Sequence, residues 1–341
     1  LHENGVLVSW DIELGELTQV DSAPLKSALG VEEASDGEGS LLFGDGGVGL
    51  LRDGDLELHW SLEIDRAVEF ARGDQAGGVG LDSEGAAFAW FEDGSTKELG
   101  PASSAVLSKG RDWIAVGGEG RELHLHSTQR GVEPRSLSLE SVSERALKGM
   151  KITHMAFHPN GGSLAVHTST DRAVRVIDLE TGAEQMFHRW TTLRGLEFSD
   201  DGSTLLLWTG RHPTARTLDV ATGKPVDAMT LLKAPVIAAA LSHDASFVAA
   251  GSLDGMLSVW EKGTGKTYLE QDRGEDVVSA VAFRGTGDKA GVLVATRSGF
   301  LWGVPLHPLS VVKEHMPAPL APWIADREVK LAEPFTYLPN K

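Results

Sequence analysis

The sequence predicts an all-β fold, a β-propeller of seven full four-stranded blades, on three observations. A unit of about forty residues recurs along the chain, short apolar runs alternate with Asp-Gly and Thr-Gly turns, and glycine is abundant, with 40 residues among 341. Short runs rich in Val, Leu, Ala and Phe are typical of strands, and glycine-containing pairs are typical of hairpin turns. These turns interrupt each apolar run before it reaches the length of an ordinary helix.

The repeat is plainest in the second half of the chain. Phe157, Phe198, Leu241 and Phe283 hold the same place in four successive units, at intervals of 41, 43 and 42 residues. A propeller blade of four strands has a period of about 40–45 residues. We therefore expect these four residues on the innermost strands of four blades.

The first half carries a fainter form of the same repeat. Val31, Phe70 and Leu107 are the corresponding anchors, and the longer interval before Phe157 contains a polar stretch, residues 141–151. We interpret that stretch as an insertion between blades. The seven repeats are expected to start near residues 25, 65, 104, 152, 191, 234 and 276.

Three segments carry a recognisable signature. Val259-Trp260-Glu261 and Val8-Ser9-Trp10-Asp11 each place Trp before an acidic residue after an apolar run, and residues 156–161 read Ala-Phe-His-Pro-Asn-Gly. They resemble the Trp-Asp strand end and the Phe-Ser-Pro-Asp-Gly turn of the WD-repeat family. The resemblance covers most of residues 150–305 and implies a WD40-like β-propeller.

The resemblance also implies roles for single residues. Ser252, Asp254 and Trp260 take three of the four places of the hydrogen-bonded tetrad typical of this family. The Gly-His pair expected before the first strand is absent, with Lys233-Ala234-Pro235 near its place, and Ile177 stands where another blade would have Trp. The chain is therefore expected to be a divergent member.

Closure of the ring divides the chain into three predicted parts: residues 1–24 as closing strands, 25–312 as the seven-repeat propeller, and 313–341 as a tail. Residues 5–20 have the pattern of the last two strands of a blade. Residues 317–341 could supply the first two strands and so form a composite eighth blade, which we favour because an exposed apolar hairpin would be costly. Alternatively, the ring has seven blades, and the proline-rich tail wraps the outside or reaches a partner.

Charge and composition limit the classes of partner. The formal net charge is −18, and residues 1–150 contribute −16 of it, with 28 acidic and 12 basic side chains. Nucleic acid is therefore a poor partner, because phosphate binding needs clustered Lys and Arg. A basic partner for the acidic half is possible, but a solvated surface is the simpler interpretation.

The absence of cysteine excludes disulfides, thiolate metal sites and a thiol nucleophile. A cytoplasmic location is the default expectation for such a chain. No stretch approaches the roughly 20 apolar residues of a membrane span. We expect no metal and no cofactor.

Four patterns resemble chemical sites and are each better explained as structure. Lys262 to Thr267 lacks the first glycine of a phosphate-binding loop, and Ser242-His243-Asp244 places three triad residue types on one turn, where they cannot align. Asp36-Gly37-Glu38 and residues 53–57 have too few carboxylates for calcium. His124 and His126 share one strand face but would need further ligands from a neighbouring blade.

The family resemblance places partner binding on the narrow face, where inner strands begin and where second and third strands connect. The residues there, with Trp190 as an exposed anchor just before an inner strand, are Arg66, Thr153, Asp171, Trp190, Arg194, Arg211, His212 and Ile237. Arg194, Arg211 and His212 would form a basic patch in an acidic protein. An acidic peptide or acidic protein surface is therefore the expected ligand.

We expect a non-catalytic platform for protein–protein interaction, either by itself or as a subunit or domain of a larger assembly. The alternative is a propeller-type enzyme, a hydrolase or lyase, with a site at the mouth of the channel. Such a site would need acid and base groups that converge from several blades.

Overall fold

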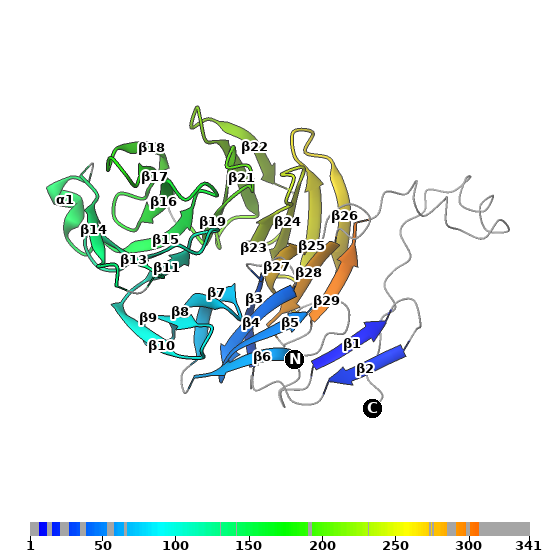
Figure 1. The fold of residues 1–341 in the computed structure, drawn as a ribbon. Coiled ribbons are helices and arrows are strands. Elements are labelled where there is room, and N and C mark those ends of the chain that lie inside the picture. Colours follow the sequence, from blue (N-terminus) through cyan, green and yellow to red (C-terminus); the bar gives the residue numbers. More distant parts are fainter. Residues whose placement is uncertain are drawn as a thin grey trace.

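The structure is a computed structural model, and its arrangement of strands confirms the predicted all-β propeller (Figure 1). The residues that it describes are 7–11, 16–20, 27–34, 39–52, 58–64, 67–129, 131–140, 142–189, 193–230, 232–272, 274, 276–284, 291–297 and 301–306. Arg66, Trp190 and residues 313–341 lie outside these ranges.

Six antiparallel sheets of four strands form blades 1 to 6. Blade 1 contains β3 (Ser27–Glu33), β4 (Gly39–Asp45), β5 (Gly47–Arg52) and β6 (Leu58–Glu63). Blade 2 contains β7 (Val68–Asp74), β8 (Gly77–Asp82), β9 (Ala86–Phe91) and β10 (Thr96–Pro101). Blade 3 contains β11 (Ser104–Leu107), β12 (Trp113–Gly117), β13 (Glu122–Ser127) and β14 (Arg135–Ser138).

The second half continues the same pattern. Blade 4 contains β15 (Ile152–Phe157), β16 (Ser163–Thr168), β17 (Ala173–Asp178) and β18 (Glu184–Arg189). Blade 5 contains β19 (Gly195–Phe198), β20 (Thr204–Trp208), β21 (Thr214–Asp219) and β22 (Pro225–Thr230). Blade 6 contains β23 (Val236–Leu241), β24 (Phe247–Ser252), β25 (Met256–Glu261) and β26 (Thr267–Asp272).

Blade 7 is described only in part. Its described residues form three strands, β27 (Val278–Arg284), β28 (Gly291–Thr296) and β29 (Leu301–Pro305). A separate hairpin of β1 (Leu7–Asp11) and β2 (Glu16–Val20) lies with β1 next to β29 (Figure 1). The proposed partner strands within residues 317–341 lie outside the described residues, so the composite eighth blade stays a prediction.

The first strand of each blade faces the centre of the ring. Neighbouring first strands contact one another in the order β3, β7, β11, β15, β19, β23 and β27, and β27 in turn contacts β3. The ring thus closes between its first and seventh blades. The predicted repeat starts at residues 104 and 152 coincide with β11 and β15, and the others lie within four residues of their strands.

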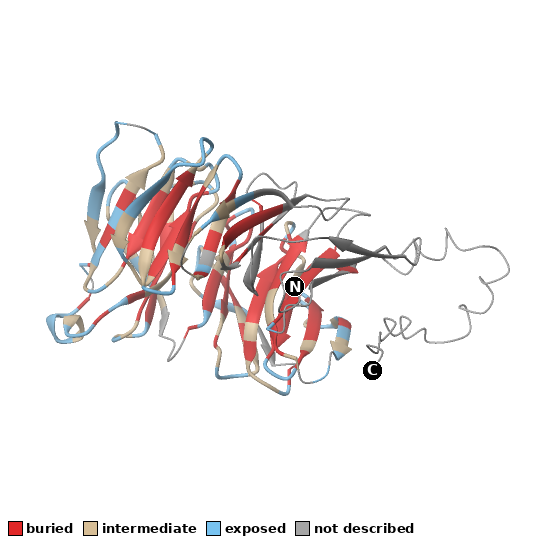
Figure 2. Cartoon of the chain, turned by 90° about the horizontal axis from the view of Figure 1, so that it is seen from below, coloured by how far each residue is buried: buried red, intermediate tan, exposed pale blue. Residues whose placement is uncertain are grey.

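The core lies between adjacent blades rather than inside any one of them. One cluster joins Leu123 and Leu125 of blade 3 to Ile152, Met155 and Leu164 of blade 4. Figure 2 shows buried residues along the strand centres and exposed residues at the turns. Because each blade covers the apolar face of the next, the repeats stabilise one another.

Glycine permits the closest approach of one blade to the next. A Cβ atom at Gly251 would lie 2.1 Å from Cγ1 of Val278, on the inner strand of the following blade. Gly117 stands in the same relation to Ile152, at 2.6 Å from Cγ2. These strands could not carry larger residues here without moving the blades apart.

The long interval between the third and fourth repeats holds a short helix, α1 (Glu144–Leu147). Leu139, Val142 and Met150 on either side of α1 are buried in the cluster between blades 3 and 4. The insertion is therefore anchored to the ring and leaves its β-sheets unbroken.

Candidate functional site: the central cavity and its narrow face

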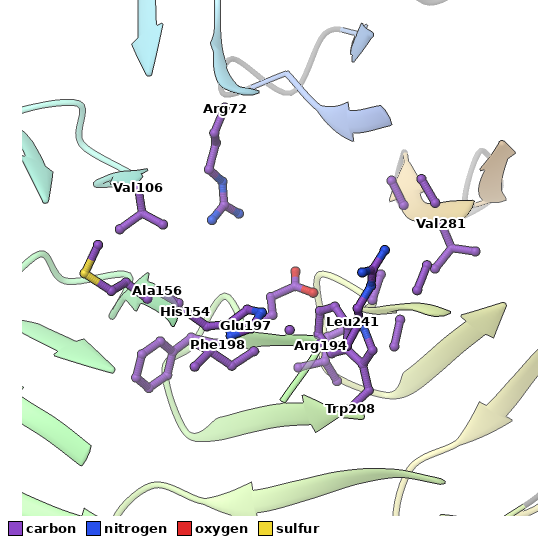
Figure 3. Close-up of a pocket in the computed structure, with 18 of the residues that line it drawn as sticks. Arg72, Val106, His154, Ala156, Arg194, Glu197, Phe198, Trp208, Leu241 and Val281 are labelled. Carbon is purple, nitrogen blue, oxygen red and sulfur yellow. The ribbon is translucent and has the colours of Figure 1, made fainter. Parts of the chain in front are cut away.

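The inner strands enclose a cavity of about 920 Å³ along the axis of the ring (Figure 3). Side chains from β7, β11, β15, β19, β23 and β27 line it. Consecutive residues of an inner strand line it, such as residues 153–157 of β15, because each inner strand presents its edge to this space. A central cavity in such a ring is a natural place for a ligand.

Several residues predicted for partner binding come together at one end of the cavity. Thr153, Arg194 and Ile237 all line it. Arg211 and His212 are exposed on the turn after β20, and the backbone oxygen of His212 accepts a hydrogen bond from Val236 N at the start of β23. The narrow face thus brings five predicted residues together, whereas Arg66 and Trp190 lie outside the described residues.

Asp171 is held within its own blade. Its carboxylate accepts hydrogen bonds from the Arg175 guanidinium, the Thr168 hydroxyl and the Ala173 amide. Burial would raise the pKa of Asp171, but the hydrogen bonds from Arg175 and Thr168 outweigh it, so the pKa lies below its ordinary value. The charge of Asp171 is therefore already compensated before any partner arrives.

The tetrad positions of blade 6 are linked only in part. The Ser252 hydroxyl donates to the Asp254 carboxylate and accepts from Met256 N at 3.1 Å. Trp260 is fully buried, and its Nε1 has no hydrogen-bond partner among the described residues. Ser252 and Asp254 therefore stabilise the turn between β24 and β25, while Trp260 contributes packing.

Sequence reasoning missed six charged residues of the cavity, which are Glu69, Arg72, Lys109, Glu197, Asp200 and Arg297. Figure 3 shows the side chains of Arg72, Arg194 and Glu197 extending into the same space. Within the part of the chain that the structure describes, Arg72, Arg194 and Arg297 form no ion pair with a carboxylate. Arg72 lies on β7, the inner strand of blade 2, so listing the charged residues of each predicted inner strand could have found it.

A hydroxyl between two imidazoles is the closest approach to catalytic geometry among the described residues. Thr153 Oγ1 lies 2.6 Å from Nδ1 of His167 and 3.1 Å from Nδ1 of His154. Burial, followed by the nearby His167, lowers the pKa of His154 to about 4. An imidazole with that pKa is a weak general base at neutral pH, so the arrangement favours a structural hydrogen-bond network.

The same pKa predicts how stability depends on pH. The folded pKa of His154 is below its unfolded value of 6.5. Acid therefore favours the unfolded state, and the stability present above pH 6.5 is lost as the pH falls toward 4. Between pH 7.5 and 5 we expect a loss of about 2 kcal/mol from this residue.

Urea unfolding followed by circular dichroism at several pH values measures this loss. The variant His154→Gln has a neutral side chain throughout and should show a flatter dependence on pH. Equal pH slopes for the two proteins would contradict the assignment.

Two further sequence patterns that resemble chemical sites form turns in the structure. Ser242 Oγ donates to Asp244 at 2.7 Å, while the His243 ring contacts Asp200 of another blade, so the three do not form a triad. Gly265 N donates to Glu261 O, which makes the loop from Lys262 a hairpin turn. Residues 36–38 and 53–57 lie outside the described residues.

The histidine pair on β13 gathers no further ligands. His124 contacts Ser136 Oγ, and both ring nitrogens of His126 are buried with no hydrogen-bond partner among the described residues. In the described ranges, no three His, Asp or Glu side chains are placed to hold a metal ion.

None of the helical residues that the structure describes forms a segment long and apolar enough to cross a lipid bilayer.

Comparison with known proteins gives one match. Residues 229–261, which include the first three strands of blade 6, match the family model WD40: WD domain, G-beta repeat. No curated protein matches the sequence. The matched repeat and the ring of antiparallel four-stranded sheets are consistent with a divergent WD-repeat β-propeller.

Proposed function

We propose that the protein is a non-catalytic interaction platform whose narrow face binds an acidic peptide segment or an acidic protein surface. One observation carries this proposal. Arg194 and Arg297 line the cavity at the narrow face and form no ion pair with a described carboxylate, in a chain with a net charge of −18. The coarser property, a fold of the kind that serves protein interaction, follows from the WD40 repeat and the propeller sheets.

The position of these cations favours recognition from outside. Arg194 and Arg297 are exposed at the ends of strands held by the ring, and Arg211 and His212 are exposed beside them. Binding residues are often found on such turns, because a rigid scaffold fixes their positions. A guanidinium can bind a carboxylate through two parallel hydrogen bonds, which gives both affinity and orientation.

A labelled hexaglutamate peptide tests the proposal directly, with hexaglutamine as the uncharged control peptide. Fluorescence anisotropy at low salt should show binding of hexaglutamate alone. The double variant Arg194→Gln, Arg297→Gln should weaken it about 5- to 30-fold, because each exposed charge pair contributes about 0.5–1 kcal/mol.

Lys224→Gln provides the matched control, since it removes a positive charge from an exposed turn between β21 and β22. Its affinity for hexaglutamate should equal that of the wild type. Equal affinity of the wild type and the double variant would refute the proposed face. The partner protein that binds this face is expected to form a larger assembly with the chain. It should also compete with hexaglutamate for binding to the narrow face.

A further inference from the structure

The opposite end of the cavity carries its own set of charged residues. In blades 3, 4, 5 and 6 the inner strands end at Leu107, Phe157, Phe198 and Leu241. The second residue after each end lines the cavity, and these residues are Lys109, Pro159, Asp200 and His243. Equivalent positions of four blades thus meet at one mouth of the channel.

Three of these residues bond to one another across blades. Lys109 Nζ lies 2.8 Å from Oδ1 of Asp200, and His243 Nδ1 lies 2.9 Å from Oδ2 of the same carboxylate. Lys109 belongs to blade 3 and Asp200 to blade 5, so their contact passes the turn of blade 4 on its channel side. The three side chains form a bridge from blade 3 to blade 6.

The carboxylate at the centre of the bridge is ionised at any ordinary pH. The hydrogen bond from His243 lowers the pKa of Asp200 to about 2, with a further contribution from Lys109. An ionised carboxylate can only accept hydrogen bonds. His243 Nδ1 must therefore carry the proton and donate it to Asp200.

The turns that present these residues are rigid. Ser199 Oγ donates to Asp201 and accepts from Thr204 N, and Ser242 Oγ donates to Asp244 and accepts from Phe247 N. The side chains of the bridge are nonetheless partly exposed, with 57% for Lys109, 41% for Asp200 and 31% for His243. Exposed ion pairs are weak and are screened by salt, so the bridge can open without any movement of the strands.

We propose that Lys109, Asp200 and His243 form an ionic gate that restricts access to the central cavity from the face opposite the narrow face. This inference does not depend on what binds at the narrow face.

The absence of cysteine from the chain permits a direct test with single thiols. Arg72→Cys places one thiol in the cavity, two residues before the end of β7 and so near the gated mouth, and Ser279→Cys places one near the narrow face. The rate at which each thiol reacts with N-ethylmaleimide, a neutral probe, reports access to that end of the cavity. Adding Asp200→Asn to the Arg72→Cys variant should raise the reaction rate of its thiol about two- to fivefold, because an exposed ion pair contributes at most about 1 kcal/mol.

Glu180→Gln is the matched control, because it removes an exposed carboxylate from the turn between β17 and β18, on the same face, without touching the bridge. It should leave both rates unchanged. About 1 M NaCl should raise the rate at position 72 when Asp200 is present, and have no effect once Asp200→Asn has removed the bridge.

The thiol at position 279 distinguishes gating from loss of structure. An Asp200→Asn effect confined to position 72 supports the gate. An unchanged rate at position 72, or an equal rise at both positions, overturns it. Hexaglutamate binding at the narrow face should be the same with and without Asp200→Asn, so the gate and the proposed function can fail separately.

Discussion

Replacement of Arg175 with methionine is expected to lower the free energy of unfolding by about 3–5 kcal/mol. Arg175 is fully buried, and its guanidinium contacts Asp171 and, at 3.4 Å, Oε2 of Glu184. The side chains of Asp171 and Glu184 are only 16% and 6% exposed. Without the guanidinium, the carboxylates of Asp171 and Glu184 would both lose a buried cation in a poorly solvated site, and removing one partner of a buried ion pair is strongly destabilising.

The urea unfolding midpoint measures this effect, and a second variant tests its cause. The triple variant Arg175→Met, Asp171→Asn, Glu184→Gln removes all three charges and should recover much of the lost stability. If the triple variant is as unstable as Arg175→Met, packing of the long side chain rather than charge explains its role. A loss below about 1 kcal/mol for Arg175→Met would contradict the network itself.

Substitution of Gly255 by alanine is expected to cost about 3 kcal/mol. Gly255 has φ +87°, and an added Cβ would lie 2.1 Å from the backbone oxygen of Gly274 and 2.9 Å from that of Asp276. Both obstacles are main-chain atoms, which no side-chain rotation can remove. The turn between β24 and β25 would have to separate from the segment between β26 and β27.

Gly265→Ala isolates the conformational part of this cost. Gly265 also has positive φ, +64°, but its added Cβ would meet nothing within 4 Å. We expect about 1 kcal/mol for this variant, measured by urea unfolding beside Gly255→Ala. Equal losses for the two variants would show that the close approach to Gly274 and Asp276 is unimportant.

The repeat was predictable because short stretches of sequence determine it: the spacing of the residues that end the inner strands and the turns that follow them. Phe157, Phe198 and Leu241 each end an inner strand, as their common spacing and following turns indicate. The contact of β1 with β29 could not be read from strand patterns, because such patterns do not state which neighbour a strand will join. Closure of the ring depends on contact between β27 and β3, the inner strands of the seventh and first blades.

The site was predicted less completely than the fold. Thr153, Arg194 and Ile237 were predicted from their expected position on the narrow face, and they lie beside the cavity. That expected position did not reveal that Asp171 is bonded to Arg175. An arginine between Val174 and Val176 on a strand was a signal that could have been used, since an apolar strand carries a buried charge only with a partner. The contact of Lys109 with Asp200 joins residues 91 positions apart, and no sequence pattern connects them.

The meeting of β3 with β27 also has a consequence for synthesis of the chain. β3 begins about 250 residues before its neighbour on that side, so the first blade leaves the ribosome long before the seventh can cover it. Pairings between such distant segments form slowly, and uncovered apolar strands are prone to aggregate meanwhile. Nascent chains stalled before residue 278 should therefore be cleaved by protease at sites in blade 1 that become resistant once β27 has emerged.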